Sequence, residues 1–406
     1  MLTDILPFSP AALGQEEIVE VDAIEKDIFV LYKSIFKDRE STFFFWKGRV
    51  ALYSILRCLG LQPGDEVIVP GFTCVVVANA IIYLGAKPIY ADIDPLSYNI
   101  NIETVEPLIS SRTKVIIAQN TFGLSPDLDS LSALAEERGI YLIEDCAHGL
   151  GGSYKNRPAG TVAHASFFST QWSKPITTGL GGVAYIRDKS LAGKMAEFYK
   201  TLPEPNAFDK AMLALQLLLF PLINFPNIYY ALVNLYRFLT QKVGLSVGSS
   251  SGDELLRPVM PTNYLKRMGT LQFRLFFKNL KKLKNRVIKR NHVWNFYNAY
   301  FCNTKIQTPY PTEPAGHSML RYPIRVGNKS KVLSLAMRHK IPIGDWLVSP
   351  LHPVEGNLEP WGYRYGMCPH AEKACAEVIN LFTDHALSSR KLDALYKIIV
   401  DGMDGW

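Results

Sequence analysis

The sequence lacks paired cysteines. Its six cysteines form no Cys-x-x-Cys pair and no spacing typical of a metal site: Cys58, Cys74, Cys146, Cys302, Cys368 and Cys375. This pattern argues against a disulfide framework and a zinc centre, and it favours reduced thiols in a cytosol. We therefore expect a cytoplasmic protein that holds no metal.

Other absences narrow the class of protein further. The first residues lack the basic start and the long apolar run of a secretory signal peptide, so we expect none. No internal repeat and no low-complexity tract is present. The net charge of +7 is modest and no recognised nucleic-acid-binding motif accompanies it, which predicts anionic ligands or surfaces but no nucleic-acid partner.

From about residue 43, apolar runs alternate with helical patterns. Four runs read as buried strands: 65–72, 87–94, 114–123 and 140–149. Helical patterns fill the intervals, with the clearest over 74–86 and 127–139. The strands lack polar alternation, which predicts an α/β fold with a mostly parallel sheet covered by helices on both faces. Ligands bind beyond the carboxyl ends of such strands.

The second half of the sequence loses this rhythm. A length of 406 residues suggests two domains, and a Gly/Ser run at 247–252 reads as a linker. We predict a large domain over 1–257, with an apolar helical insertion at about 205–250. The smaller C-terminal α+β domain then covers 258–406, and a long basic helix is expected over 268–291.

One short stretch, SFFSTQWSKPITTGLGG, places a single lysine between a strand and a glycine-rich turn. Lys174 has no acidic residue near it in sequence. Asp145 closes another apolar run, where a carboxylate is costly unless a cation meets it. Ser169 lies five residues before the lysine, and a helix that opens near Gly48 and Arg49 offers free N–H groups to an anion.

A single ligand would use all of these groups together. It needs a phosphate, a ring nitrogen and an aldehyde, and pyridoxal 5'-phosphate (PLP) has all three. A desolvated lysine amine forms a Schiff base with an aldehyde, so Lys174 would be the covalent attachment point. Asp145 would keep the pyridine nitrogen protonated, and the lysine, once displaced, could move protons between substrate and cofactor carbons.

The chain resembles the DegT/DnrJ/StrS family of PLP-dependent sugar aminotransferases, which have the fold-type I architecture. The resemblance covers about residues 40–190 and returns more weakly at CPHAEKACAEVINL; the main motifs are GDEVIVPGFT, GAKPIYADIDP, TKVIIAQNTFG, LIEDCAHGLGGSYKNRPAG and FSTQWSKPITTGLGG. It implies a homodimer whose cofactor pocket is completed across the subunit interface.

The resemblance assigns roles position by position. Lys174 matches the Schiff-base lysine and Asp145 the carboxylate on the pyridine nitrogen. His148 matches the residue that contacts the ring hydroxyl, and Ser169 matches a phosphate ligand. Taken alone, each has an ordinary interpretation: a surface lysine, a turn aspartate, a structural histidine and a strand-end hydroxyl.

Five further positions matter because they match the family pattern less closely. Arg49, with the Val50 backbone, falls in the phosphate-binding turn, where the family carries Thr or Ser; it could instead pair with an acid on the surface. Cys74 stands where an aromatic residue usually stacks on the cofactor. Asn263 is a candidate to reach the partner subunit's phosphate. His352 lies in WLVSPLHP, near the family's substrate cleft, with a structural role as its alternative.

The resemblance implies transfer of an amino group from an amino acid, usually glutamate, to a nucleotide-linked keto-deoxy sugar for polysaccharide or cell-surface glycan synthesis. Two alternatives are a catalytically silent PLP-binding regulator or scaffold and a PLP-dependent sugar dehydratase. Dehydrating relatives carry histidine in place of the lysine, so Lys174 speaks against the dehydratase.

The apolar segment 211–239 is not part of the family pattern. Its length could span a bilayer, but two prolines interrupt it, which favours a helical hairpin or a broken helix pair. The neighbouring basic helix carries ten Lys or Arg and no acid between Lys266 and Arg290. Burial against a dimer partner, peripheral membrane contact through both segments, and a true span remain open.

Overall fold

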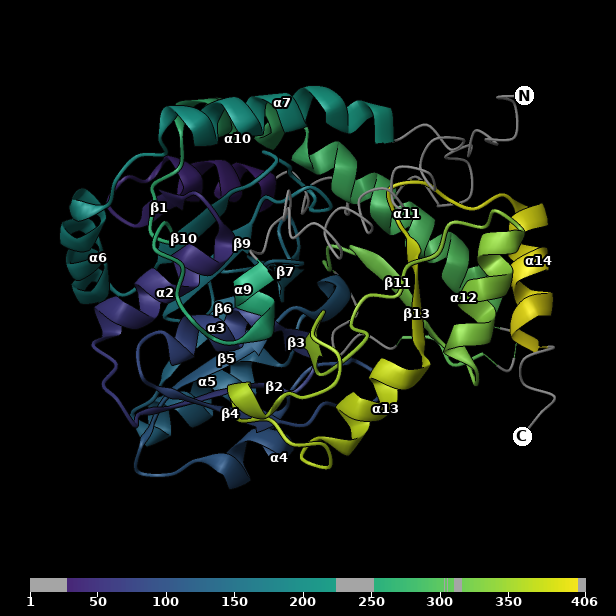
Figure 1. Ribbon diagram of the computed structural model, residues 1–406, viewed down its shortest axis with the longest axis horizontal. Helices are drawn as coiled ribbons and strands as arrows, with labels where there is room; N and C mark the ends of the chain where they lie inside the picture. Colours follow the sequence, from purple (N-terminus) through teal and green to yellow (C-terminus); the bar gives the residue numbers. More distant parts are fainter. Residues whose placement is uncertain (1–27, 224–251, 303, 305, 310–315, 401–406) are drawn as a thin grey trace.

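The computed structural model describes residues 28–223, 252–302, 304, 306–309 and 316–400 (Figure 1). Its centre is a seven-stranded sheet. The strand order is β1 (Thr42–Phe45), β10 (Gly182–Ile186), β9 (Ala165–Ser169), β6 (Tyr141–Asp145), β5 (Thr113–Gln119), β2 (Glu66–Pro70) and β4 (Lys87–Ala91). The five strands from β9 to β4 are parallel to their neighbours, and β10 alone runs antiparallel to both β9 and β1.

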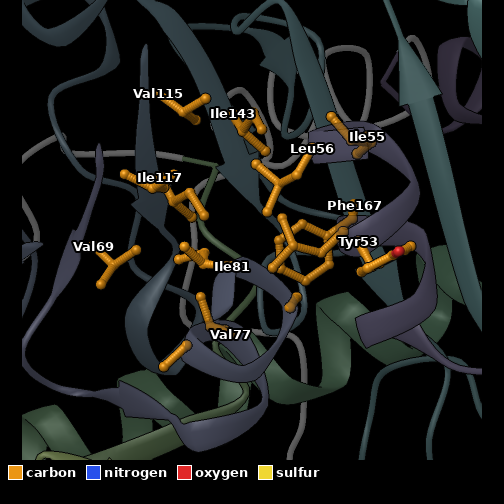
Figure 2. Close-up of a cluster of buried hydrophobic side chains, with 14 of the residues drawn as sticks. Tyr53, Ile55, Leu56, Val69, Val77, Ile81, Val115, Ile117, Ile143 and Phe167 are labelled. Carbon is orange, nitrogen blue, oxygen red and sulfur yellow. The ribbon is translucent and has the colours of Figure 1, made fainter. Parts of the chain in front are cut away.

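Helices cover both faces of this sheet, as predicted. On β5 the side chains of Val115 and Ile117 join one buried cluster, whereas those of Ile116 and Ala118 join another. The surrounding elements are α2 (Gly48–Leu59), α3 (Val75–Ile82), α4 (Ile102–Val105), η1 (Glu106–Leu108), η2 (Thr121–Gly123), α5 (Leu128–Arg138) and α6 (Lys189–Thr201). Figure 2 shows the first cluster, where side chains from α2 and α3 meet the sheet. The predicted α/β class is confirmed.

The C-terminal part contains a two-stranded antiparallel sheet, β11 (Arg321–Arg325) and β13 (Val378–Phe382). Its helices are α11 (Leu283–Phe301), α12 (Lys329–Arg338), α13 (Pro369–Glu377) and α14 (Ser389–Val400), with the turn η3 (Glu359–Trp361). Both strands and helices α11, α12 and α14 share a second buried cluster, which includes Tyr322 and Tyr297, whereas α13 and η3 pack into the large cluster of the main sheet. An α+β composition was expected here, while the boundary at residue 257 stays a prediction.

The single long helix predicted over 268–291 is wrong. Two helices occupy this region, α10 (Thr270–Leu280) and α11, and the chain turns between them at Lys281 and Lys282. Phe276 and Leu280 of α10 and Leu283 of α11 all pack into the cluster that also buries Phe36 and Phe44. The turn allows both helices to place apolar side chains in that cluster.

Two short strand pairs complete the fold near the predicted strand ends. β3 (Thr73–Cys74) pairs in parallel with β12 (Leu351–His352), and β7 (Ser153–Tyr154) pairs with β8 (Arg157–Pro158). The β3–β12 pair joins the segment between α12 and η3 to the residues that follow the carboxyl end of β2. It thereby brings residues separated by more than 270 positions to the same place.

The apolar segment is described only in part. Helix α7 (Ala207–Ile223) includes Pro221, so the predicted break does not fall at the first proline. Residues 224–239 of the predicted hairpin lie outside the described residues. Among the helices that the structure describes, none combines the length and the apolar character needed to cross a membrane. In Figure 1, α7 lies along α10 at one side of the molecule.

Candidate active site

A cavity of about 340 Å³ opens at the carboxyl ends of β5, β6 and β9. Seven of the nine residues that the sequence predicts for the site line it: Arg49, Cys74, Asp145, His148, Ser169, Lys174 and His352. Of the other two, Val50 is fully buried inside α2, and Asn263 is exposed on a turn. The structure therefore brings seven of the predicted residues together at the strand ends, while their roles stay predictions.

Lys174 lies in the turn after β9, and its position there is half-buried. Burial lowers the pKa of its ammonium group to about 8, while the negative charge of Asp145 acts in the opposite direction. Its Nζ lies 4.7 Å from the ring centre of Trp346. At neutral pH a larger fraction of this amine is uncharged than in an ordinary lysine, which suits a nucleophile.

Asp145 is the last residue of β6 and is 4% exposed. Burial raises the pKa of its carboxyl group to about 6, opposed by the N–H of Ala147, which donates to Oδ1 at 2.8 Å, and by the charge of Lys174. Neighbouring Glu144 raises this pKa further. A carboxylate held in this way gains from a protonated partner inside the cavity.

The imidazole of His148 stacks on the indole of Trp346, with ring centres 5.0 Å apart and planes 4° from parallel. The backbone N–H of Phe122 donates to His148 Nδ1 at 3.2 Å. Burial, followed by the charges of Lys174 and Arg321, holds the pKa of His148 well below its usual value. The ring is therefore neutral, and because Nδ1 accepts, Nε2 carries the proton.

The N-terminus of α2 forms one wall of the cavity. Its N-cap residue, Lys47, makes no side-chain capping bond, and Gly48 begins the helix beside Ser169. A methyl group on Gly182 would collide with the carbonyl oxygen of Lys47 and the backbone nitrogen of Gly48, so only glycine allows β10 to pass this close. The N–H of Val50 donates to the carbonyl oxygen of Lys47 at 3.1 Å within the first turn.

The Arg49 side chain enters a buried ion pair. Its Nη1 lies 2.9 Å from Oε2 of Glu254 in α9 (Gly252–Leu256), and both side chains are almost fully buried. Asn79 of α3 donates to the carbonyl oxygen of Glu254 at 3.0 Å. Arg49 thus pairs with an acid, but in a buried pair and not on the surface as the alternative had it, and it still lines the cavity.

Cys74 and His352 face each other across the β3–β12 pair, where they are register partners. His352 Nδ1 accepts from the N–H of Val348 at 3.3 Å, and burial lowers its pKa to about 4, so the ring is neutral. Burial raises the pKa of the Cys74 thiol, which keeps it protonated. Both residues therefore bring uncharged groups to the cavity.

The cavity-lining residues that sequence reasoning missed include Lys47 and Trp346. Trp346 lies in the stretch that led to His352, and an aromatic residue beside a predicted cleft was the available signal. Lys47 immediately precedes Gly48, and a second basic residue at the predicted helix start was its signal. Among the described residues, no cluster of three or more His, Cys, Asp or Glu side chains is placed to hold a metal ion.

The fold and the cavity define a class of protein: an α/β protein with a desolvated lysine, a buried carboxylate and a helix N-terminus around one cavity at the carboxyl ends of the strands. Comparison with known sequences gives the family. The profile of the DegT/DnrJ/EryC1/StrS aminotransferase family matches residues 45–211 and 239–400, and the chain belongs to this family. Residues 212–238 fall between the two matches, which confirms that the apolar segment is not part of the family pattern.

Curated relatives include characterised sugar enzymes. The chain is 44% identical over 149 residues to the UDP-2-acetamido-2-deoxy-3-oxo-D-glucuronate aminotransferase of Pseudomonas aeruginosa, and 39% identical over 151 residues to the GDP-perosamine synthase of Escherichia coli O157:H7. These matches span 36% and 37% of this chain but only 41% and 42% of the relatives. A longer match, 26% identical over 392 residues, covers 92% of this chain and 91% of an uncharacterized protein of Methanocaldococcus jannaschii.

Solved structures share the fold over almost the whole chain. The aminotransferase TlmJ of Streptoalloteichus hindustanus has a TM-score of 0.67 at 21% identity, with 97% of each chain covered. NtdA of Bacillus subtilis, solved with bound cofactor PMP, has a TM-score of 0.66 at 19% identity, covering 98% of this chain and 86% of its own. The predicted fold-type I architecture is confirmed. Enzymes of this family depend on PLP, so the predicted cofactor is confirmed for the family.

Proposed function

We propose that the chain is a PLP-dependent aminotransferase that moves an amino group from an amino acid, glutamate in this proposal, to the keto group of a nucleotide-linked deoxy sugar. The product would serve polysaccharide or cell-surface glycan synthesis. One observation carries the proposal: Lys174 and Asp145 share a cavity whose wall is the N-terminus of α2. The names of the relatives, which include two nucleotide-sugar enzymes, support the acceptor class.

The residues present fit the cofactor. Ser169 is 8% exposed, and among the described residues its hydroxyl has no hydrogen-bond partner, so a phosphate oxygen would satisfy it. Asp145 lies where a protonated pyridine nitrogen would offset the cost of its burial. Lys174 supplies an amine for an aldehyde. These three groups require a phosphate, a ring nitrogen and an aldehyde on one molecule.

The side chains of this protein have distinct tasks in the proposed reaction. The bound cofactor supplies an electron sink for charge that develops on the substrate carbon. Asp145 holds the ring nitrogen in its protonated form, and Lys174 Nζ moves a proton to and from the substrate carbon. Nε2–H of His148 is a hydrogen-bond donor for the ring hydroxyl. His352 is proposed to contact the sugar as a neutral donor.

A direct test is to incubate the purified protein with PLP, glutamate and a panel of nucleotide-linked keto sugars, and to search for aminated products by mass spectrometry. We expect one member of the panel to be converted. The Lys174→Ala variant should lose at least about 1000-fold in turnover, because both the attachment point and the proton carrier are removed. The proposal would be contradicted if the purified protein binds the cofactor but converts no keto sugar with any amino donor.

We also propose that the protein is a cytoplasmic homodimer. Asn263 is exposed on the turn before α10, a position from which it can reach a partner subunit. Six thiols without a disulfide support a reducing compartment. Sedimentation velocity at micromolar concentration should give twice the chain mass of 45.6 kDa, and a monomer would contradict the dimer.

Peripheral membrane contact is the last part of the proposal. The outer face of α7 exposes Phe208, Met212, Leu215 and Leu218, which follow one another at helical spacing. Exposed cations on α10 and in the turn after it accompany this face: Arg274, Lys278, Lys281 and Lys282. An apolar helical face beside positive charge suits an anionic lipid surface.

A further inference from the structure

Two cationic residues lie at the start of α2, Lys47 and Arg49, and the family resemblance assigns no role to Lys47. We propose that the ammonium group of Lys47 binds the phosphate of the cofactor, together with the N-terminus of α2 and the hydroxyl of Ser169. This inference rests on the proposed function, because it names a residue of the same cavity. It concerns a residue of this chain outside the set that the motifs predict.

The position of Lys47 is the first support. The residue is the N-cap of α2, with an extended backbone (φ −145°, ψ 154°), and it lines the cavity beside Gly48. The backbone here is fixed by the tight passage of Gly182 against the Lys47 carbonyl group. A lysine at this point can reach an anion that sits on the free N–H groups of the helix.

Ser169 is an independent indication that an anion belongs in this corner. It ends β9, lines the same cavity, and is more than nine-tenths buried. A methyl group added to Gly48 would lie 3.2 Å from Ser169 Cβ, so the serine side chain sits directly at the helix terminus. Within the described part of the chain its hydroxyl has no hydrogen-bond partner, so it can bond to a phosphate oxygen in the cavity that it lines.

The charge balance explains why a lysine is needed. A phosphate monoester carries about −1.5 to −2 charges at neutral pH, and a helix N-terminus supplies the equivalent of roughly half a positive charge. The guanidinium of Arg49 is already paired with Glu254 at 2.9 Å. Lys47, whose charge also interacts with those of Arg49, Glu254, Lys266 and Asp209, brings a further cation to this end of the cavity.

The environment of Lys47 also favours an anion. Burial, followed by the charge of Arg49, lowers the pKa of its ammonium group to about 8, although Glu254 and Asp209 act in the opposite direction. A cation that is desolvated beside another cation is stabilised when a dianion arrives. Binding should then raise this pKa again, so phosphate affinity should fall as the pH rises above about 8.

The test compares PLP with pyridoxal, which lacks the phosphate. Full-length cofactor-free protein is titrated with each compound, and binding is followed by the visible absorbance of the bound ligand. Lys47→Met should weaken PLP binding by at least about tenfold and leave pyridoxal binding within about twofold, because a hydrogen bond to a charged group is lost. Lys47→Arg should retain most of the affinity. The exposed Lys278→Met serves as the matched control and should change neither.

The results separate this inference from the proposed function. If Lys47→Met weakens both ligands equally, or neither, Lys47 does not bind the phosphate. If the unsubstituted protein takes up neither ligand, the proposed function fails. The inference is then decided by the thermal shift that inorganic phosphate produces: a shift lost in Lys47→Met supports it, and an equal shift overturns it. Lys47→Gln provides a second neutral variant should the methionine variant not fold.

Discussion

At the scale of single residues, the proposed attachment of the cofactor to Lys174 depends on the protonation state of this lysine. Only the neutral amine attacks an aldehyde. With a pKa of about 8, about a tenth of the amine is neutral at pH 7. An ordinary lysine with a pKa of about 10.4 has less than roughly one part in a thousand neutral at that pH. Burial therefore raises the supply of the reactive form by more than about a hundredfold.

Cofactor capture should consequently depend on pH. The rate at which cofactor-free protein takes up PLP should rise with pH and level off above about 8, because the ammonium form disappears through that range. In Asp145→Asn the rise should move to lower pH, since the carboxylate that favours the charged lysine is gone. Stopped-flow absorbance measures both profiles. A rise that continues up to pH 10 in the unsubstituted protein would contradict a desolvated lysine.

The sequence allowed much of the site to be predicted at this scale, because the relevant residues end strands of a parallel sheet. Asp145 and Ser169 are the last residues of β6 and β9, and Lys174 follows in the next turn. Trp346 could not be placed, because it reaches Lys174 from about 170 positions away through the β3–β12 pairing. No local pattern encodes such a contact.

At the scale of elements, the Arg49–Glu254 pair connects α2 with α9, and 205 residues separate the two partners. Both side chains are nearly removed from solvent, at 6% and 2% exposure. Taking one charge away leaves the other buried without the group that it faces, which costs far more than losing an exposed pair. The pair therefore fixes α9 against α2, the helix whose start lines the cavity.

We expect Glu254→Gln to lower the free energy of unfolding by about 3–5 kcal/mol, measured by urea denaturation. The exposed pair Arg364–Glu359, whose groups lie 3.9 Å apart, offers a matched control, and Glu359→Gln should cost under about 1 kcal/mol. Replacing both partners, Arg49→Met with Glu254→Leu, should recover part of the loss. Equal costs for the buried and the exposed glutamate variants would refute this account.

Helices and strands were predicted well where a hydrophobic run in the sequence determines them. They were predicted poorly where packing between distant parts of the chain determines them. The predicted strands 65–72, 87–94 and 140–149 correspond to β2, β4 and β6, each shorter by a few residues. The break between α10 and α11 falls at two lysines, with no glycine or proline to signal it. It follows instead from the shared cluster that both helices enter, which only the folded chain assembles.

At the scale of the whole molecule, the insertion sets this chain apart from the family profile. The profile stops at residue 211 and resumes at 239, so selection for the shared chemistry does not explain the apolar residues of α7. One side of α7 is buried against the rest of the protein: Leu213 is 2% exposed and packs with Trp46 and Leu180. The other side exposes Leu218 at 74% and Phe208 at 70%, and burying such side chains is worth about 1.5–3 kcal/mol each.

Contact of this exposed face with an anionic membrane predicts a specific lipid dependence. The protein should sediment with phosphatidylglycerol vesicles and much less with phosphatidylcholine vesicles, and added salt should release it, because each lysine near an anionic surface contributes about 1 kcal/mol. Leu215→Gln combined with Leu218→Gln should weaken vesicle binding by at least about tenfold and leave PLP uptake unchanged. Leu96→Gln, an equally polar change at an exposed leucine outside α7, should leave binding as it is. If the protein ignores vesicles of either composition, or if the double variant alters the sedimentation of the protein alone, the face of α7 meets another copy of the chain and the membrane contact is wrong.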